Sequence, residues 1–284
     1  MSKIAIMTDT NSGMDADEAA ELGIFVIPMP FIVDGDEYFE GVNCTYEHFF
    51  EMLGSGSDVS TSQPSPDVLT SFWDKLLKDH DQVVHIPMSS ALSGSMGTAR
   101  ALAEDYDGRV VVVDNKRISI SQRQSAVDAL KLAERGLSAQ EIKDELEKRS
   151  FDASIYLAVN TLELLKKSGR VTKAGAAIAA VLNLKPVLQI QGSKLDAFSK
   201  ARGMANAEKI MLSAVEKDIK ERFAGKKIHL ETAYSGDIEP ANEWLETVRK
   251  TFPDFDVQLR KLPVSISCHV GAGVKAIGVI EYID

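Results

Sequence analysis

The chain has 284 residues, a formal net charge of −10 and a pI near 5.1, so it can build one large domain or two medium ones. This acidic balance argues against nucleic acid as a general partner, because binding phosphate backbones requires a basic face. Cys44 and Cys268 form no CxxC pattern, so we expect no disulfide framework, metal site or other cofactor. No signal-peptide layout and no membrane-length apolar run occur, which predicts a soluble, cytoplasmic protein.

The first half of the chain alternates between short apolar runs and amphipathic segments. The runs that predict strands are Ile4–Met7, Gln82–Met88 and Arg109–Val113. Helices are expected over Asp15–Leu22, Tyr46–Leu53, a segment opening at Pro66, Leu92–Ala103, Ser119–Arg135 and Ser138–Arg149. This order predicts a doubly wound, mostly parallel sheet with helices on both faces. The Asp34-Gly35 pair predicts a tight hairpin turn within the same half.

The second half has a different rhythm. Strands are expected over Ser154–Val159, Pro186–Gln191, Lys194–Lys200, Lys227–Tyr234, Asp256–Leu262 and Lys275–Tyr282. Helices are expected over Leu162–Lys167, Lys173–Leu182, Met204–Phe223 and Pro240–Thr251. We therefore predict an N-terminal α/β domain over residues 1–154 and a smaller α+β domain with a mostly antiparallel sheet over residues 155–284.

Hydroxyl side chains gather where one predicted strand passes into a helix. Ser90, Ser93 and Ser95 lie at this helix start, where unpaired backbone N–H groups and the helix dipole favour an anion. The alternative is that the serines only cap the helix. Asp9-Thr10 and Thr61-Ser62 also follow strand-like segments, so all three groups are expected at the carboxyl edge of one sheet.

Several familiar catalytic motifs are absent or misplaced. Gly271–Ala276 fits a G-x-G-x-x-A dinucleotide pattern, but a strand rather than a helix follows it. The chain has no phosphate-binding P-loop and no G-x-S-x-G elbow. Asp9 lacks the second carboxylate that an aspartate-nucleophile phosphatase uses. We therefore predict no catalytic residue.

Short motifs in order along nearly the whole chain resemble the bacterial DegV family. They are Thr8-Asp9-Thr10, Thr61–Ser65, Ser89–Ser95, Val113-Asp114, Gly169–Val171, Lys185–Leu188 and His269 before Gly271–Gly273. The better understood members of that family are the fatty-acid-binding subunits of fatty acid kinase. The chain departs from the family pattern at residues 115–123, which lack the glycines common there.

The resemblance implies a long-chain fatty acid as ligand. Its carboxylate would be held by the hydroxyls of Thr61 and Ser93, with His269 and Arg170 near the head group. Its tail would occupy an apolar tunnel between the two domains. A buried carboxylate needs several charge-assisted hydrogen bonds, and burial of the tail at about 0.8 kcal/mol per CH₂ supplies affinity. The neighbouring hydroxyls of Ser62 and Ser95 are assigned to the same carboxylate.

The resemblance also implies a task. The protein would present the carboxylate to a separate fatty acid kinase subunit, which makes an acyl phosphate for phospholipid synthesis, and transient contact with a membrane surface fits that task. Arg170, Lys173 and Arg202 would dock this kinase.

An acyl hydrolase is the alternative. In that reading Ser93 is the nucleophile, His269 the base, and Asp9 or Asp114 orients the histidine. Cys268 and His269, interpreted as part of a strand-like region, would point to opposite faces and make a poor thiolate pair.

Overall fold

The computed structural model describes residues 2–174, 184–192 and 194–284, and its chain divides into two compact units. Unit 1 comprises Met1–Pro30, Ser62–Phe151 and Tyr282–Asp284, and unit 2 comprises Phe31–Thr61 and Asp152–Glu281. The spatial division therefore differs from the predicted one at residue 154. Segment 31–61 belongs to unit 2, which makes unit 2 the larger of the two.

Packing explains why segment 31–61 belongs to unit 2 and why residues 282–284 belong to unit 1. In unit 2, Phe31 and Phe49 share an apolar cluster with Val264 and Cys268 from the far end of the chain. In unit 1, Ile283 is buried with the helices that cover the parallel sheet, and the ammonium of Lys131 donates a hydrogen bond to its carbonyl at 2.7 Å. Neither pairing is visible in the order of elements along the chain.

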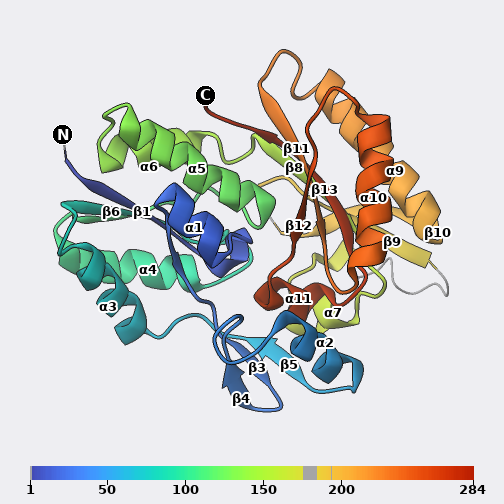
Figure 1. Ribbon diagram of the computed structural model, residues 1–284, viewed down its shortest axis with the longest axis horizontal. Helices are drawn as coiled ribbons and strands as arrows, with labels where there is room; N and C mark the ends of the chain where they lie inside the picture. Colours follow the sequence, from blue (N-terminus) through green and yellow to red (C-terminus); the bar gives the residue numbers. More distant parts are fainter. Residues whose placement is uncertain (1, 175–183, 193) are drawn as a thin grey trace. The chain divides into compact units, whose positions relative to one another are not determined.

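Unit 1 is built on a four-stranded, fully parallel sheet in the order β2-β1-β6-β7, of which β1 and β6 are labelled in Figure 1. Its strands are β1 (Ile4–Asp9), β2 (Phe25–Ile27), β6 (Gln82–Ile86) and β7 (Val110–Val112). Its helices are α1 (Ala16–Leu22), α3 (Pro66–Leu76), α4 (Ser95–Ala103), α5 (Ile120–Glu134) and α6 (Ala139–Lys148), with short 3₁₀ turns at Thr10–Ser12 and Glu104–Tyr106.

Helices cover both faces of this sheet. One apolar cluster packs α1, α5 and α6 against one face, and a second packs α3 and α4, including the fully buried Trp73, against the other. The predicted doubly wound domain is therefore confirmed. Local sequence sets the helix starts, because the side chains of Asp15, Ser65 and Ser138 accept hydrogen bonds from backbone N–H groups in the first turns of α1, α3 and α6.

Unit 2 contains a six-stranded sheet in the order β10-β9-β8-β13-β11-β12. Its strands are β8 (Ala153–Ala158), β9 (Leu184–Ile190), β10 (Asp196–Arg202), β11 (Ile228–Tyr234), β12 (Gln258–Lys261) and β13 (Lys275–Glu281). All neighbours are antiparallel except β11 and β12, which confirms the mostly antiparallel prediction. Helices α9 (Met204–Lys220) and α10 (Ile238–Thr251) pack against it through a core that includes Met211 and Trp244 (Figure 1).

A smaller three-stranded sheet in unit 2 carries the predicted hairpin. Strand β3 (Phe31–Val33) lies between β4 (Asp36–Tyr38) and β5 (Val59–Thr61), and α2 (Tyr46–Gly54) joins β4 to β5. Asp34 and Gly35 have φ angles of 51° and 97°, as a two-residue hairpin turn requires. Next to this sheet lie α7 (Glu163–Ser168) and α11 (Val264–Val270).

Three further points of the sequence analysis concern residues 173–182, residues 115–123 and membrane-spanning helices. The predicted helix over 173–182 lies outside the described residues from position 175 onward. Residues 115–123 contain two non-glycine residues with φ of 55°, Lys116 and Ser119, so side chains occupy a backbone conformation that favours glycine. Within the described ranges, no helix combines the length and the apolar character that crossing a membrane requires.

Candidate functional site

Thr61 and His269 form the centre of the candidate site, and both belong to unit 2. Thr61 is the last residue of β5, and its hydroxyl Oγ1 lies 2.9 Å from Nε2 of His269. His269 lies between the strands β12 and β13, as the sequence suggests, but it is on helix α11, so the interpretation of Cys268 and His269 as part of a strand is wrong. The run from Val264 to Val270 is apolar enough for either structure, and its contacts with β3, β5 and α7 decide for a helix.

The helix α11 leaves only the histidine partly exposed. The other six of its seven residues are buried, including Val264, Ser267 and Cys268. Its C-terminal end is fixed because the Ser235 hydroxyl donates to the Gly271 carbonyl at 2.5 Å. The partly exposed His269 ring is therefore carried by a helix whose other six residues are buried.

The histidine is neutral at physiological pH. Burial, with the nearby positive charge of Arg170 as the second cause, lowers the pKa of His269 to about 4. Among the described residues, its Nδ1 atom is buried and has no hydrogen-bond partner. A neutral imidazole carries one proton on either nitrogen, so this ring can either donate to Thr61 or accept from it.

Arg170 supplies the positive charge of this cluster. It follows Gly169, whose φ of 69° ends α7, and its guanidinium donates to the Ser168 carbonyl. The ammonium of Lys167, on the same helix, pairs with Asp58 just before β5. The structure therefore brings together three predicted site residues of unit 2, namely Thr61, His269 and Arg170.

The predicted serines lie in unit 1. The Ser93 hydroxyl accepts the Ser95 backbone N–H at 3.1 Å and donates to the Ser95 hydroxyl at 3.0 Å, at the N-terminal end of α4. Ser62 is exposed, and its hydroxyl donates to the carbonyl of Gln63 at 3.2 Å. The expectation that Thr61 shares a sheet edge with Asp9 and Ser89 is wrong, because Thr61 belongs to the small sheet of unit 2.

The two aspartates considered for a hydrolase are occupied. Asp9 is buried and accepts hydrogen bonds from Met88, Asn11 and Gln122, although burial still raises its pKa. Asp114 accepts from the hydroxyl of Ser90 at 2.6 Å. Since Nδ1 of His269 has no partner among the described residues, the base–carboxylate pair of a catalytic triad is not formed.

A small cavity of about 10 Å³ lies next to Ser95 in unit 1. Gln63, His85, Ser95 and Thr98 contribute its polar lining, and Gln63 hydrogen bonds with Thr98 at 2.9 Å. His85 is fully buried, and burial lowers its pKa to about 3, so it is also neutral.

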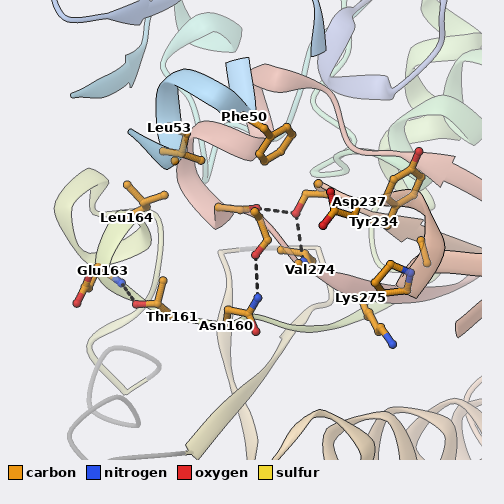
Figure 2. Close-up of a pocket in the computed structure, with 18 of the residues that line it drawn as sticks. Phe50, Leu53, Asn160, Thr161, Glu163, Leu164, Tyr234, Asp237, Val274 and Lys275 are labelled. Atoms are coloured by element: carbon orange, nitrogen blue, oxygen red, sulfur yellow. Dashed lines mark hydrogen bonds between the residues drawn. The ribbon is translucent and has the colours of Figure 1, made fainter. Parts of the chain in front are cut away.

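Unit 2 contains a pocket of about 660 Å³, and Figure 2 shows residues that line it. Phe50, Leu53 and Leu164 line one part of it, and Asn160, Asp237 and Lys275 line another. Loop 271–274, which begins two residues after His269, also lines the pocket. Asn160 donates to the Ala272 carbonyl at 3.0 Å. Gly273 has a φ of 75°, which favours glycine, and a Cβ atom there would lie 2.2 Å from the side-chain nitrogen of Asn160, so a larger residue would strain the backbone and displace that side chain. This mixed lining differs from a uniformly aliphatic tunnel.

Comparison with known proteins agrees with this architecture. The model of the DegV family, described as "Uncharacterised protein, DegV family", matches residues 3–282. The chain belongs to the DegV family. A DegV domain-containing protein from Deinococcus radiodurans is 29% identical over 280 residues, which cover 97% of each chain.

Two solved structures extend the likeness. A DegV family protein from Thermus thermophilus, whose structure is described under fatty acid binding, is 29% identical, with 98% of this chain and 99% of that one covered and a TM-score of 0.86. DegV from Bacillus subtilis, a fatty acid binding protein, is 24% identical, with 99% and 100% covered and a TM-score of 0.87. At 24% identity the second likeness shows the fold alone.

The remaining predicted residues of this DegV family chain lie on its surface. Lys173 and Arg202 are exposed, and Arg202 ends the edge strand β10.

Cys44 and Cys268 are free, and both are buried in the cluster around α11, where burial raises their pKa values, that of Cys268 to about 12. Within the described ranges, no group of three or more His, Cys, Asp or Glu residues could hold a metal ion.

The sequence does not single out Glu40, yet its carboxylate touches the helix that carries His269. Oε2 of Glu40 accepts the backbone N–H of Val264 at 2.7 Å. The two residues are 224 positions apart, so no local pattern signals the contact.

Proposed function

We propose that this protein binds a long-chain fatty acid and presents its carboxylate to a separate kinase that forms an acyl phosphate. The observation that carries the proposal is the hydrogen bond between Thr61 and His269 beside the charge of Arg170. The fatty acid binding described for the Thermus thermophilus relative, at 29% identity over nearly the full length of both chains, supports the ligand class.

The chemistry of the cluster fits a carboxylate. With its proton on Nε2, His269 donates to Thr61 Oγ1, and the Thr61 O–H then remains to donate to a carboxylate oxygen. The neutral ring brings no charge, so Arg170 is the cation that offsets the negative head group. The hydroxyls of Ser62, Ser93 and Ser95 stay assigned to the same carboxylate by the family resemblance.

The protein itself acts as a carrier in this proposal. The hydrolase alternative is not proposed, because no described carboxylate orients His269. The exposed side chains of Lys173 and Arg202, together with Arg170, are proposed to dock the kinase, since an acidic surface on that partner would pair with them.

The test begins with the purified protein. Extraction under denaturing conditions followed by mass spectrometry is expected to release a fatty acid in a near-stoichiometric amount. Delipidated protein is then titrated with a panel of long-chain fatty acids. No bound fatty acid and no binding to any member of the panel would overturn the proposal.

The kinase step is tested separately. Fatty acid-loaded protein, ATP, Mg²⁺ and a purified bacterial fatty acid kinase subunit should yield an acyl phosphate, trapped as a hydroxamate. Arg202→Glu is expected to lower this yield and leave fatty acid affinity unchanged, whereas equal yields from the variant and the native chain would exclude Arg202 from docking.

A further inference from the structure

The backbone contact of Glu40 places a carboxylate at the start of α11. Val264 is the first residue of this helix, and Pro263 before it offers no side-chain cap. The first N–H groups of a helix have no partner within the helix and carry partial positive charge. Glu40 therefore caps α11 from a distant part of the chain, through a hydrogen bond of 2.7 Å.

The turn that holds Glu40 is itself well fixed. Glu40 lies two residues after β4, and around it the Phe39 N–H donates to the Asn43 side chain at 2.7 Å and the Gly41 N–H donates to the Cys44 carbonyl at 3.0 Å. The side chain is partly buried. A cap on such a turn can transmit the position of the small sheet to α11.

The carboxylate of Glu40 has several charged and titratable neighbours. Burial raises the pKa of Glu40, while the Val264 N–H and the positive charge of Lys261 lower it. The negative charge of Glu47 raises the pKa of Glu40, opposite to the effect of Lys261. Along with burial, the charge of Glu40 in turn raises the pKa values of its other titratable neighbours, Cys44, Tyr46 and Cys268. Lys261 stands over the Tyr46 ring, 4.5 Å from its centroid.

Both ends of α11 contact residues at the three-stranded sheet of unit 2. Its first residue contacts Glu40 just beyond β4, and His269 near its last turn contacts Thr61 at the end of β5. The five helical steps from Val264 to His269 span only about 7.5 Å. A shift at one end of so short a helix moves the ring at the other.

We propose that Glu40 is the positioning residue of the carboxylate site: its cap on Val264 fixes α11 so that the His269 ring meets the Thr61 hydroxyl. The proposal rests on the proposed function for its meaning in binding, but the ring position itself can be measured without any ligand. Without the cap, the N-terminal turn of α11 loosens and the buried ring gains solvent.

The first experiment follows the His269 ring by NMR in ligand-free protein. Its signal is assigned with His269→Gln, and its pKa is compared in the native chain, Glu40→Gln and Glu40→Ala. We expect the pKa to rise from about 4 toward 6.5 in Glu40→Ala, with a smaller rise in Glu40→Gln, whose amide oxygen can still accept the Val264 N–H.

The matched control is Asp218→Ala, which removes another carboxylate hydrogen bond of unit 2, the one donated by the Tyr156 hydroxyl at 2.8 Å. It should lower the melting temperature but leave the His269 pKa at its native value. An unchanged His269 pKa in Glu40→Ala would overturn the positioning role.

The second experiment measures the Kd for palmitate and oleate. Glu40→Ala should weaken binding roughly tenfold, the size of one hydrogen bond to a charged group. The double variant Glu40→Ala/His269→Gln should bind no more weakly than His269→Gln alone, because both changes remove the same ring contact. Multiplying losses would contradict the proposal. If the native chain binds no fatty acid, the proposed function fails, and the His269 pKa still decides the role of Glu40.

Discussion

The serine cluster of unit 1 and the Thr61–His269 cluster of unit 2 differ in how far each satisfies its own hydrogen bonds. In unit 1, the Ser93 hydroxyl both accepts from and donates to Ser95. In unit 2, Thr61 meets a neutral His269 whose second nitrogen has no partner among the described residues, beside the charge of Arg170. A buried polar atom without a partner costs stability, and among the described residues Nδ1 of His85 in unit 1 is another such atom. The positive charge of Arg170 is therefore what favours a carboxylate site in unit 2.

This difference has a consequence for binding. Thr61 can donate to a carboxylate once His269 holds its proton on Nε2, with no side chain moving. Ser93 must first turn its hydroxyl away from Ser95 and give up that bond. Unit 2 is therefore expected to contribute more binding free energy than unit 1.

Thr61→Val should have the largest effect, because it keeps the shape of the side chain and removes the hydroxyl from both His269 and the ligand. We expect a roughly 10- to 100-fold higher Kd for palmitate, from the loss of a hydrogen bond to a charged group. Isothermal titration calorimetry on delipidated protein measures it. Thr232→Val is the control, since Thr232 is also buried in unit 2 and donates to the Gln258 carbonyl at 3.0 Å. Equal losses in the two variants would remove Thr61 from the site.

His85 in unit 1 should make stability depend on pH. Its pKa of about 3 lies below the ordinary 6.5, so between these values the unfolded chain binds the extra proton and the folded chain does not. Stability contributed by the neutral ring is complete above pH 6.5 and falls as the pH falls, by at most about 1.4 kcal/mol per pH unit. His85→Phe should flatten the slope of unfolding free energy between pH 6.5 and 5, measured with urea. An unchanged slope would show that the ring is protonated in the folded state.

Ser93→Ala and Ser90→Ala separate ligand contact from a structural hydrogen bond in unit 1. Ser93→Ala should raise the Kd for palmitate roughly threefold to tenfold, less than Thr61→Val, because the lost bond replaces one already made to Ser95. Ser90 donates to Asp114, so Ser90→Ala should cost about 1 kcal/mol of stability and leave the Kd unchanged. Calorimetric titration measures the Kd for palmitate, and a denaturant unfolding curve measures the stability. Binding losses in Ser90→Ala that match those in Ser93→Ala would favour a purely structural role for the whole serine cluster.

Much of the fold follows from local signals in the sequence. Apolar runs such as Val83-Val84 predict buried parallel strands, and Ser138 with Glu141 predicts the capping box that begins α6. The turn at Asp34-Gly35 is equally local. The assignment of segment 31–61 to unit 2 could not be predicted in this way, because it depends on Phe31 and Phe49 packing with Val264, more than 200 positions away.

The site shows the same limit. Hydroxyls and a histidine at recognisable motifs point to Thr61, Ser93 and His269. The helix that carries His269 was hidden, because an apolar run of seven residues suits a strand as well as a helix and only tertiary packing selects one. The contact between Glu40 and Val264 joins a side-chain carboxylate to a backbone N–H 224 positions away, which no local residue pattern encodes.

Arg170→Gln is expected to change the ligand-free protein least. It tests how far the positive charge of Arg170 lowers the pKa of His269 in unit 2. Burial is the larger cause of the low pKa of His269 and the Arg170 charge the smaller, so the pKa should rise from about 4 but stay well below 6.5. An NMR titration of the ligand-free variant measures it. Palmitate affinity should fall at the same time, because the neutral ring cannot replace the lost cation. A pKa that returns to 6.5 would mean that Arg170 also keeps the ring buried, and an unchanged pKa would place its charge too far away to pair with a carboxylate at Thr61.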